Sequence, residues 1–235
     1  MATQIGFLLF PDVQQLDLTG PYEILASLPD TKMHLVARDF TPVRSVTGLT
    51  LQPTVTLLDC PQLDVLCIPG GKGVNALIED GPTLDFVRRQ ASGARYVTSV
   101  CTGALVLGAA GLLRGKRATT HWGSHDLLAA FGAIPVHARV VRDGALFTGG
   151  GVTAGIDFAL TLAAELAGRV AAQEVQLSLE YAPAPPFDAG TPDSASSSVI
   201  EAVRSRSKAI RLERERLVQT WALNDRRQVG EPNPK

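Results

Sequence analysis

Cys101 stands between an apolar run and a run of small residues. Residues 96–100 are β-branched and apolar and predict a strand, and residues 103–110 predict a buried helix. A cysteine at such a strand-to-helix corner is typical of a nucleophile elbow, which presents its side chain at the carboxyl edge of a sheet. A helix N-terminus behind the sulfur lowers the pKa of a thiol, and the thiolate is the reactive form. We therefore expect Cys101 to be an exposed and reactive nucleophile.

The other two cysteines fit structural roles. Cys67 lies inside the continuous apolar run 64–68, and Cys60 precedes a proline in a loop. Three cysteines, an odd number, argue against a disulfide framework and favour a reducing compartment, so we expect a cytoplasmic protein.

Two glycine-rich turns follow predicted strands. Gly70 and Gly71 follow the run 64–68, and their N–H groups can face a developing negative charge, although a simple turn is the alternative. Gly150 lies in the triplet 149–151, which has neither the lysine of a P-loop nor the spacing of a dinucleotide fingerprint. We interpret this second turn as close packing around a pocket.

Two histidines four residues apart, His121 and His125, raise the question of a metal. No glutamate follows His121 and no third ligand is near in the sequence, so we expect no metal site. His121 and Trp122 are instead expected to form part of a pocket wall.

The elements that must position these residues alternate between strand and helix. A helix is expected from about residue 17 to 27, and hairpins at 46–51 and 139–148. Further strands are expected at 4–10, 32–38, 64–68 and 95–100, and further helices at 82–92, 102–110, 124–131 and 152–166. The pattern predicts an α/β fold with a doubly wound, mostly parallel sheet sandwiched by helices.

The composition changes near residue 182. Residues 182–190 are too rich in proline for regular structure, and 201–223 carry Arg and Glu at helical spacing. Residues 230–235 are expected to be disordered. We interpret residues 1–195 as the catalytic domain and 196–235 as a charged helical extension with a tail.

Charge and hydropathy exclude several classes of partner. The 22 basic and 23 acidic residues nearly cancel, so nucleic acid is not expected. The apolar runs are too short to cross a bilayer, and the start of the chain has no basic segment typical of a signal peptide.

Three motifs together resemble the ThiJ/PfpI superfamily, which has the class I glutamine amidotransferase-like fold. They are LDLTGP at 16–21, IPGG at 68–71 and VCTG at 100–103. The resemblance extends in order over residues 4–195 and is greatest to the members that hydrate isocyanides.

The resemblance implies roles for three residues. Cys101 matches the nucleophile, Asp17 the acidic residue that approaches it from the first loop, and Thr102 the hydroxyl beside it. It also implies a homodimer, no cofactor, and hydration of isocyanides to N-substituted formamides through a thioimidate on Cys101. A carboxyl near a thiolate is expected to have a raised pKa and can then carry a proton, although a helix cap is an alternative role for Asp17.

Two other functions stay open. The sensor domains of AraC-like regulators resemble this fold, but they precede paired helix-turn-helix motifs for which the residues after the proline-rich stretch are too few. Glyoxalase-like or deglycase-like stress proteins place His directly after the cysteine, whereas this chain has Thr102 there.

Overall fold

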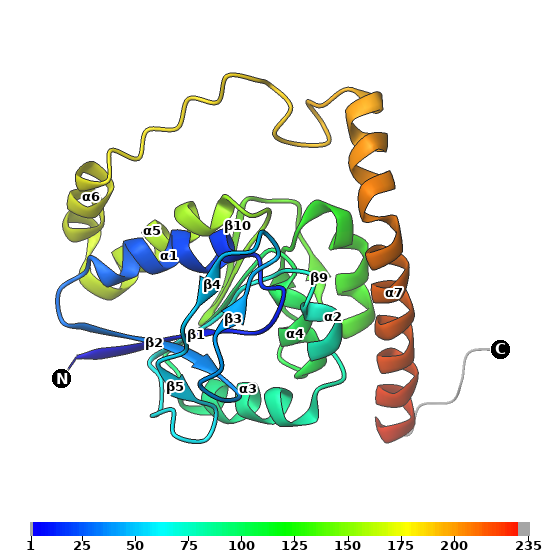
Figure 1. Ribbon diagram of the computed structural model, residues 1–235, viewed down its shortest axis with the longest axis horizontal. Coiled ribbons are helices and arrows are strands. Elements are labelled where there is room, and N and C mark those ends of the chain that lie inside the picture. The colour runs from blue at the N-terminus through cyan, green and yellow to red at the C-terminus, as the bar shows by residue number, and fades with distance from the viewer. Residues whose placement is uncertain (1, 230–235) are drawn as a thin grey trace.

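The computed structural model describes residues 2–229, and a seven-stranded sheet lies at its centre (Figure 1). The strand order is β10-β11-β7-β6-β1-β2-β5, and every neighbouring pair is parallel except the β10–β11 hairpin. The strands are β1 (Thr3–Leu8), β2 (Thr31–Ala37), β5 (Val55–Thr56), β6 (Val65–Ile68), β7 (Tyr96–Val100), β10 (Val140–Asp143) and β11 (Leu146–Gly149). The doubly wound, mostly parallel sheet is thus confirmed.

Helices cover both faces of this sheet. In Figure 1, α1 (Gln15–Ala26) and α5 (Ala154–Ala167) pack together on one side, and α3 (Gly81–Gly93) and α4 (Gly103–Ala109) lie on the other. Every residue of β6 is buried as a result, which is why its sequence is a continuous apolar run.

Short elements complete the body. The hairpin expected at 46–51 starts earlier, with β3 (Val43–Arg44) and β4 (Thr50–Leu51), while β8 (Arg117–Ala118) and β9 (Ile134–Pro135) form a small parallel pair. The helix expected at 124–131 is a 3-10 helix, η1 (Trp122–Phe131), and α2 (Val74–Leu77) is a single turn. The two-residue strands are too short to produce a periodic signal in the sequence.

The C-terminal part crosses the molecule. After α6 (Arg169–Ser178), which the sequence analysis did not predict, residues 179–196 form an irregular strap to α7 (Ser197–Val229). The charged segment is therefore helical as predicted, and it is docked on the body: Leu217 and Val218 join the core, and Trp221 packs on Phe131 with ring centroids 4.6 Å apart. Residues 230–235, expected to be disordered, lie outside the described residues.

Within residues 2–229, none of the helices combines the length and the apolar character that a membrane span needs.

Candidate active site

Cys101 forms a sharp corner between β7 and α4. Its φ of 54° lies in the left-handed region, which residues with a side chain rarely adopt. Its N–H donates to the Gly149 carbonyl at 3.0 Å, and its own carbonyl accepts the Thr120 hydroxyl at 2.6 Å. A Cβ on Gly103 would lie 2.1 Å from the Ile68 carbonyl oxygen, so α4 can follow the corner only with glycine there. This is the strand-turn-helix geometry predicted for a nucleophile elbow.

The environment of the thiol differs from the expectation. Cys101 is only 6% exposed. Its pKa is raised well above its ordinary value, because burial and the charge of Asp17 outweigh the Thr102 N–H and the charge of Arg214. The expectation of an exposed thiol with a lowered pKa is wrong, since the same close packing that forms the corner removes the sulfur from water.

Exposure does not distinguish Cys101 from the other thiols. Cys60 is the most accessible of the three cysteines, and Cys67 is buried within β6 as predicted. Burial raises the pKa of Cys60 to about 11 and that of Cys67 to about 12. What sets Cys101 apart is its corner geometry and its ionisable neighbours.

Asp17 lies on α1 with its carboxyl turned into the protein and is 1% exposed. Burial raises the pKa of Asp17 to about 7, although the Gly70 N–H and the Cys101 thiol lower it. The Gly70 N–H donates to Asp17 Oδ2 at 2.9 Å, whereas Oδ1 has no hydrogen-bond partner among the described residues. The predicted direction of the pKa shift is confirmed, but burial rather than a thiolate is its main cause.

The alternative role of Asp17 as a helix cap is wrong. Helix α1 begins at Gln15, its cap position is Gln14, and no side chain caps it. Asp17 is therefore free to face the thiol.

The IPGG turn holds the site together from the other side. The Gly71 N–H donates to Thr102 Oγ1 at 3.1 Å. A Cβ on Gly70 would lie 2.8 Å from Asp17 Oδ2 and 2.7 Å from Thr102 Oγ1, so this turn separates the two side chains by the width of one glycine. Both N–H groups expected to face a substrate donate instead to Asp17 and Thr102, and the Thr102 hydroxyl contacts the turn.

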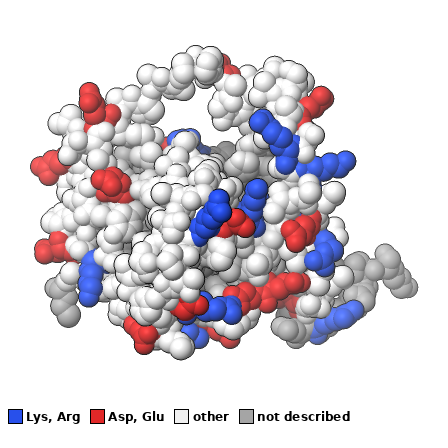
Figure 2. All heavy atoms as spheres, in the orientation of Figure 1, with Lys and Arg blue, Asp and Glu red and all other residues white. Residues whose placement is uncertain are grey.

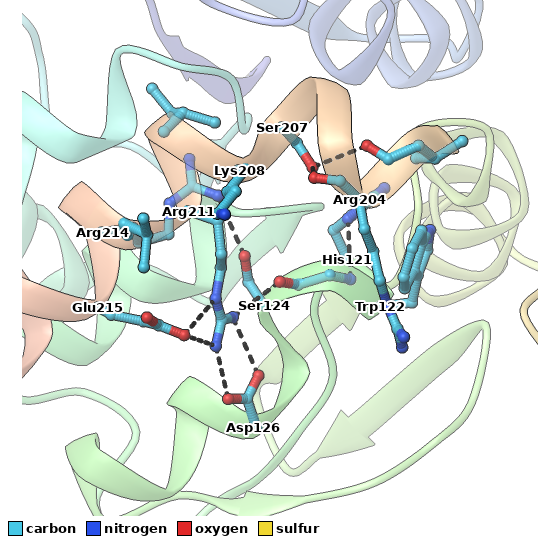
Figure 3. Close-up of a pocket in the computed structure, with 14 residues that line it drawn as sticks. His121, Trp122, Ser124, Asp126, Arg204, Ser207, Lys208, Arg211, Arg214 and Glu215 are labelled. Carbon is cyan, nitrogen blue, oxygen red and sulfur yellow. Dashed lines mark hydrogen bonds and ion pairs between the residues drawn. The ribbon is translucent and has the colours of Figure 1, made fainter. Parts of the chain in front are cut away.

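His121 and Trp122 line a cavity of about 450 Å³ between η1 and α7, as expected for a pocket wall (Figure 3). His121 Nδ1 accepts the Gly123 N–H at 3.2 Å, and burial together with the charge of Arg214 lowers the pKa of His121. The ring is therefore neutral near pH 7.

Gly150 lies outside the lining of that cavity. Its N–H donates to the Arg139 carbonyl at 2.9 Å, and a Cβ at this position would lie 3.4 Å from the Ala138 carbonyl oxygen and 3.6 Å from that of Arg139. It packs the chain behind the elbow, where Gly149 accepts the Cys101 N–H.

The two histidines considered as metal ligands do not share a site. His125 stacks on His137 with ring centroids 3.7 Å apart, whereas His121 packs against Trp122. Over residues 2–229, no group of three or more His, Cys, Asp and Glu side chains is arranged to hold a metal ion.

Arg214 of α7 is the site residue that the sequence analysis missed. It is 7% exposed and donates to Asn75 Oδ1 at 2.8 Å, to Ser124 Oγ at 3.1 Å and to the Gly71 carbonyl at 3.3 Å. A signal was present in the sequence, because Arg214 shares helical spacing with Leu217, Val218 and Trp221 and so lies on the buried face of α7.

A mostly parallel α/β sheet with a cysteine at a sharp strand-to-helix corner, beside a buried carboxyl, places the chain in a class of α/β proteins built around such a corner. The model of the DJ-1/PfpI family matches residues 3–165, and the chain belongs to this family. It is 71% identical to the isonitrile hydratase of Pseudomonas putida over 207 residues, which are 88% of this chain and 91% of that protein.

One solved structure and one curated sequence relative are more distant matches. The crystal structure of a ThiJ/PfpI family protein from Pseudomonas syringae superposes with a TM-score of 0.90 at 44% identity, over 93% of this chain and 91% of that one. The transcriptional regulator GbdR of Pseudomonas aeruginosa is 29% identical over 176 residues, which are 70% of this chain but 47% of the regulator.

Proposed function

We propose that the protein hydrates isocyanides to N-substituted formamides, with Cys101 as nucleophile and Asp17 as proton carrier. The identity of 71% to an isonitrile hydratase, over nearly the whole of both chains, supports the substrate class. The observation that carries the residue roles is the pairing of a buried thiol with a buried carboxyl whose pKa is about 7. Such a carboxyl can both give and take a proton near neutral pH.

The first half of the reaction joins substrate and sulfur. The thiol proton of Cys101 passes to Asp17, and Asp17 delivers it to the terminal carbon of the isocyanide. The sulfur lone pair attacks the same carbon. The product is a thioimidate, R–N=CH–S–Cys101, in which carbon has gained one proton and one C–S bond.

The second half adds water and releases sulfur. Asp17, again ionised, takes a proton from water as the oxygen attacks the thioimidate carbon, and this proton passes to the substrate nitrogen. The tetrahedral adduct R–NH–CH(OH)–S–Cys101 then collapses, the C–S bond breaks, and the hydroxyl proton returns to the Asp17–Cys101 pair. The released product is R–NH–CHO, and every step uses side chains of this chain without a cofactor.

Thr102 and the Gly70–Gly71 turn have a positioning role in this scheme. The Gly70 N–H donates to Asp17 Oδ2 at 2.9 Å, and the Gly71 N–H donates to Thr102 Oγ1 at 3.1 Å. The turn therefore fixes the Asp17 carboxyl relative to the elbow. We propose that Thr102 acts through this turn.

The alternative functions have less support. This chain is 71% identical to the isonitrile hydratase over most of both chains, but only 29% identical to the regulator, over 47% of the regulator's length. Positive and negative side chains are both spread over the face seen in Figure 2, and the net charge is −1, so we propose a small-molecule partner rather than nucleic acid. Thr102 replaces the histidine expected of the deglycase-like members.

We also propose a homodimer in the cytoplasm. The strap 179–196 arches away from the body and leaves a hollow beneath it (Figures 1 and 2), and Phe187 on this strap is 81% exposed. On α6, Leu177 is 80% exposed. Large apolar side chains on a projecting segment are typical of a surface that a second copy covers.

The test is an isocyanide turnover assay on the purified protein. We expect formamide from an alkyl isocyanide, and no lactate from methylglyoxal. The Cys101→Ser variant, which lacks the thiol, tests whether turnover depends on Cys101. Absence of formamide with the folded wild-type protein would refute the proposed function, and turnover that persists in the variant would refute the role of Cys101 as nucleophile.

A further inference from the structure

The buried end of Arg214 has an unusual set of partners. Its guanidinium donates to a side-chain amide oxygen, a hydroxyl and a backbone carbonyl, and all three acceptors are neutral. Arg211, which lines the same cavity, binds two carboxylates, Asp126 and Glu215. Among the described residues, no carboxylate forms an ion pair with Arg214.

A buried cation is costly unless a negative charge lies near it. Cys101 and Asp17 can supply one, because either group becomes negative when it loses its proton. Burial lowers the pKa of Arg214, and the charge of a Cys101 thiolate opposes that shift. The charge of Arg214 in turn favours the thiolate of Cys101. Within residues 2–229, three other charged or titratable groups face Arg214. Arg211 is positive and Glu213 is negative, so their effects on Arg214 oppose each other, and His121 is neutral.

Arg214 also reaches the elbow through hydrogen bonds. Its Nη2 donates to the Gly71 carbonyl, and the N–H of the same glycine donates to Thr102 Oγ1. Thr102 follows the nucleophile directly. Three elements, α7, the IPGG turn and the elbow, are thus joined by two consecutive contacts.

We propose that Arg214 is a positioning residue of the active site, which fixes the Gly71 turn and supplies the positive charge that stabilises the Cys101 thiolate during turnover. This role gives α7 a part in the reaction. The expected effect of Arg214 on turnover rests on the proposed function. A lysine would keep the charge, but a single ammonium cannot match the planar fork that reaches three acceptors at once.

The experiment measures the alkylation of Cys101 by iodoacetamide against pH, by peptide mass analysis, together with kcat, KM and thermal stability. For Arg214→Gln we expect alkylation about tenfold slower at a fixed pH, the change that one pKa unit produces, and a lower kcat with little change in KM. For Arg214→Lys we expect a pH profile near that of the wild type, but a reduced kcat.

Arg114→Gln is the matched control. Arg114 also anchors α7, through an ion pair with Asp225 at 2.6 Å, and its loss removes one positive charge away from the site. We expect this variant to keep the wild-type profile and kcat.

Three results would overturn the proposal. The first is a folded Arg214→Gln protein with wild-type alkylation and kcat. The second is a loss of alkylation rate and kcat in Arg114→Gln equal to that in Arg214→Gln, which would mean that only the docking of α7 matters. If Arg214→Gln does not fold, an Arg214→Lys protein with unchanged kcat is the third. Wild-type protein without isocyanide turnover would refute the proposed function instead, and the alkylation comparison would still test Arg214.

Discussion

Replacing Asp17 by Asn should stabilise the protein at the pH where it abolishes the reaction. The folded-state pKa of Asp17 is about 7 and its ordinary value is 3.8, so the difference is about 3 units. Between these values the folded state binds more protons than the unfolded state, and the free energy of unfolding therefore falls as pH rises through this window. At 1.36 kcal/mol per unit, ionised Asp17 destabilises the folded protein by about 4 kcal/mol above pH 7.

Asn removes this ionisation but adds a donor. Its oxygen can accept the Gly70 N–H as Asp17 Oδ2 does, whereas its amide nitrogen would occupy the position of Oδ1, which has no partner among the described residues. An unpaired buried donor costs about 1–3 kcal/mol. The net gain at pH 8 is therefore about 1–3 kcal/mol, and it should vanish or reverse near pH 5, where the wild type is largely protonated.

The assay is chemical denaturation of both proteins at pH 5, 6, 7 and 8, with isocyanide turnover measured in parallel. We expect kcat/KM of Asp17→Asn to fall by about two to four orders of magnitude, the range of general acid–base catalysis. A stability difference that is the same at pH 5 and pH 8 would refute the raised pKa, and near wild-type turnover would refute the role of Asp17 as proton carrier.

Further predictions concern the elbow and its turn. Cys101→Ala should abolish turnover and keep the circular dichroism spectrum, and more than a few per cent of residual activity would contradict its role. Cys101 alkylation by iodoacetamide should be slow at pH 7 and accelerate with each pH unit, because burial raises the pKa of its thiol; rapid reaction at pH 6 would show a lowered pKa instead. Thr102→Val removes the partner of the half-buried Gly71 N–H and should cost about 1 kcal/mol in denaturation together with a lower kcat, and an unchanged unfolding midpoint would argue against that bond. Gly103→Ala puts a methyl group 2.1 Å from the Ile68 carbonyl oxygen and should destabilise by about 3 kcal/mol, seen as a lower Tm, while a wild-type Tm would mean that the corner relaxes.

Local sequence patterns predict the sheet and the corner at Cys101, but they do not predict the burial of its thiol or the direction in which its pKa shifts. The run before Cys101 and the small residues after it require a strand, a corner and a helix, so this geometry could be predicted. Its burial could not, because the groups that enclose the sulfur come from α1, the IPGG turn and α7, which only tertiary packing brings together. The pKa of Cys101 therefore moves opposite to the expectation from the helix N-terminus alone.

Arg214 illustrates the same limit at longer range. The sequence pattern marks the buried face of α7 but does not state which part of the protein that face meets. The division into a catalytic domain at 1–195 and an extension at 196–235 stays a prediction, whereas the position of Arg214 against Gly71 is a property of the fold.

The bond between Arg214 and Gly71 joins residues 143 positions apart in the chain. Synthesis on the ribosome proceeds from the N-terminus, so β1, the IPGG turn and Cys101 emerge and can pair well before α7 exists. A nascent chain at that stage has its sheet but an unfinished catalytic centre, and a contact of such separation forms late and slowly. With the role proposed for Arg214, we expect ribosome-bound or C-terminally truncated chains to hold a thiol that is already at its corner, and turnover to begin only when the last helix docks.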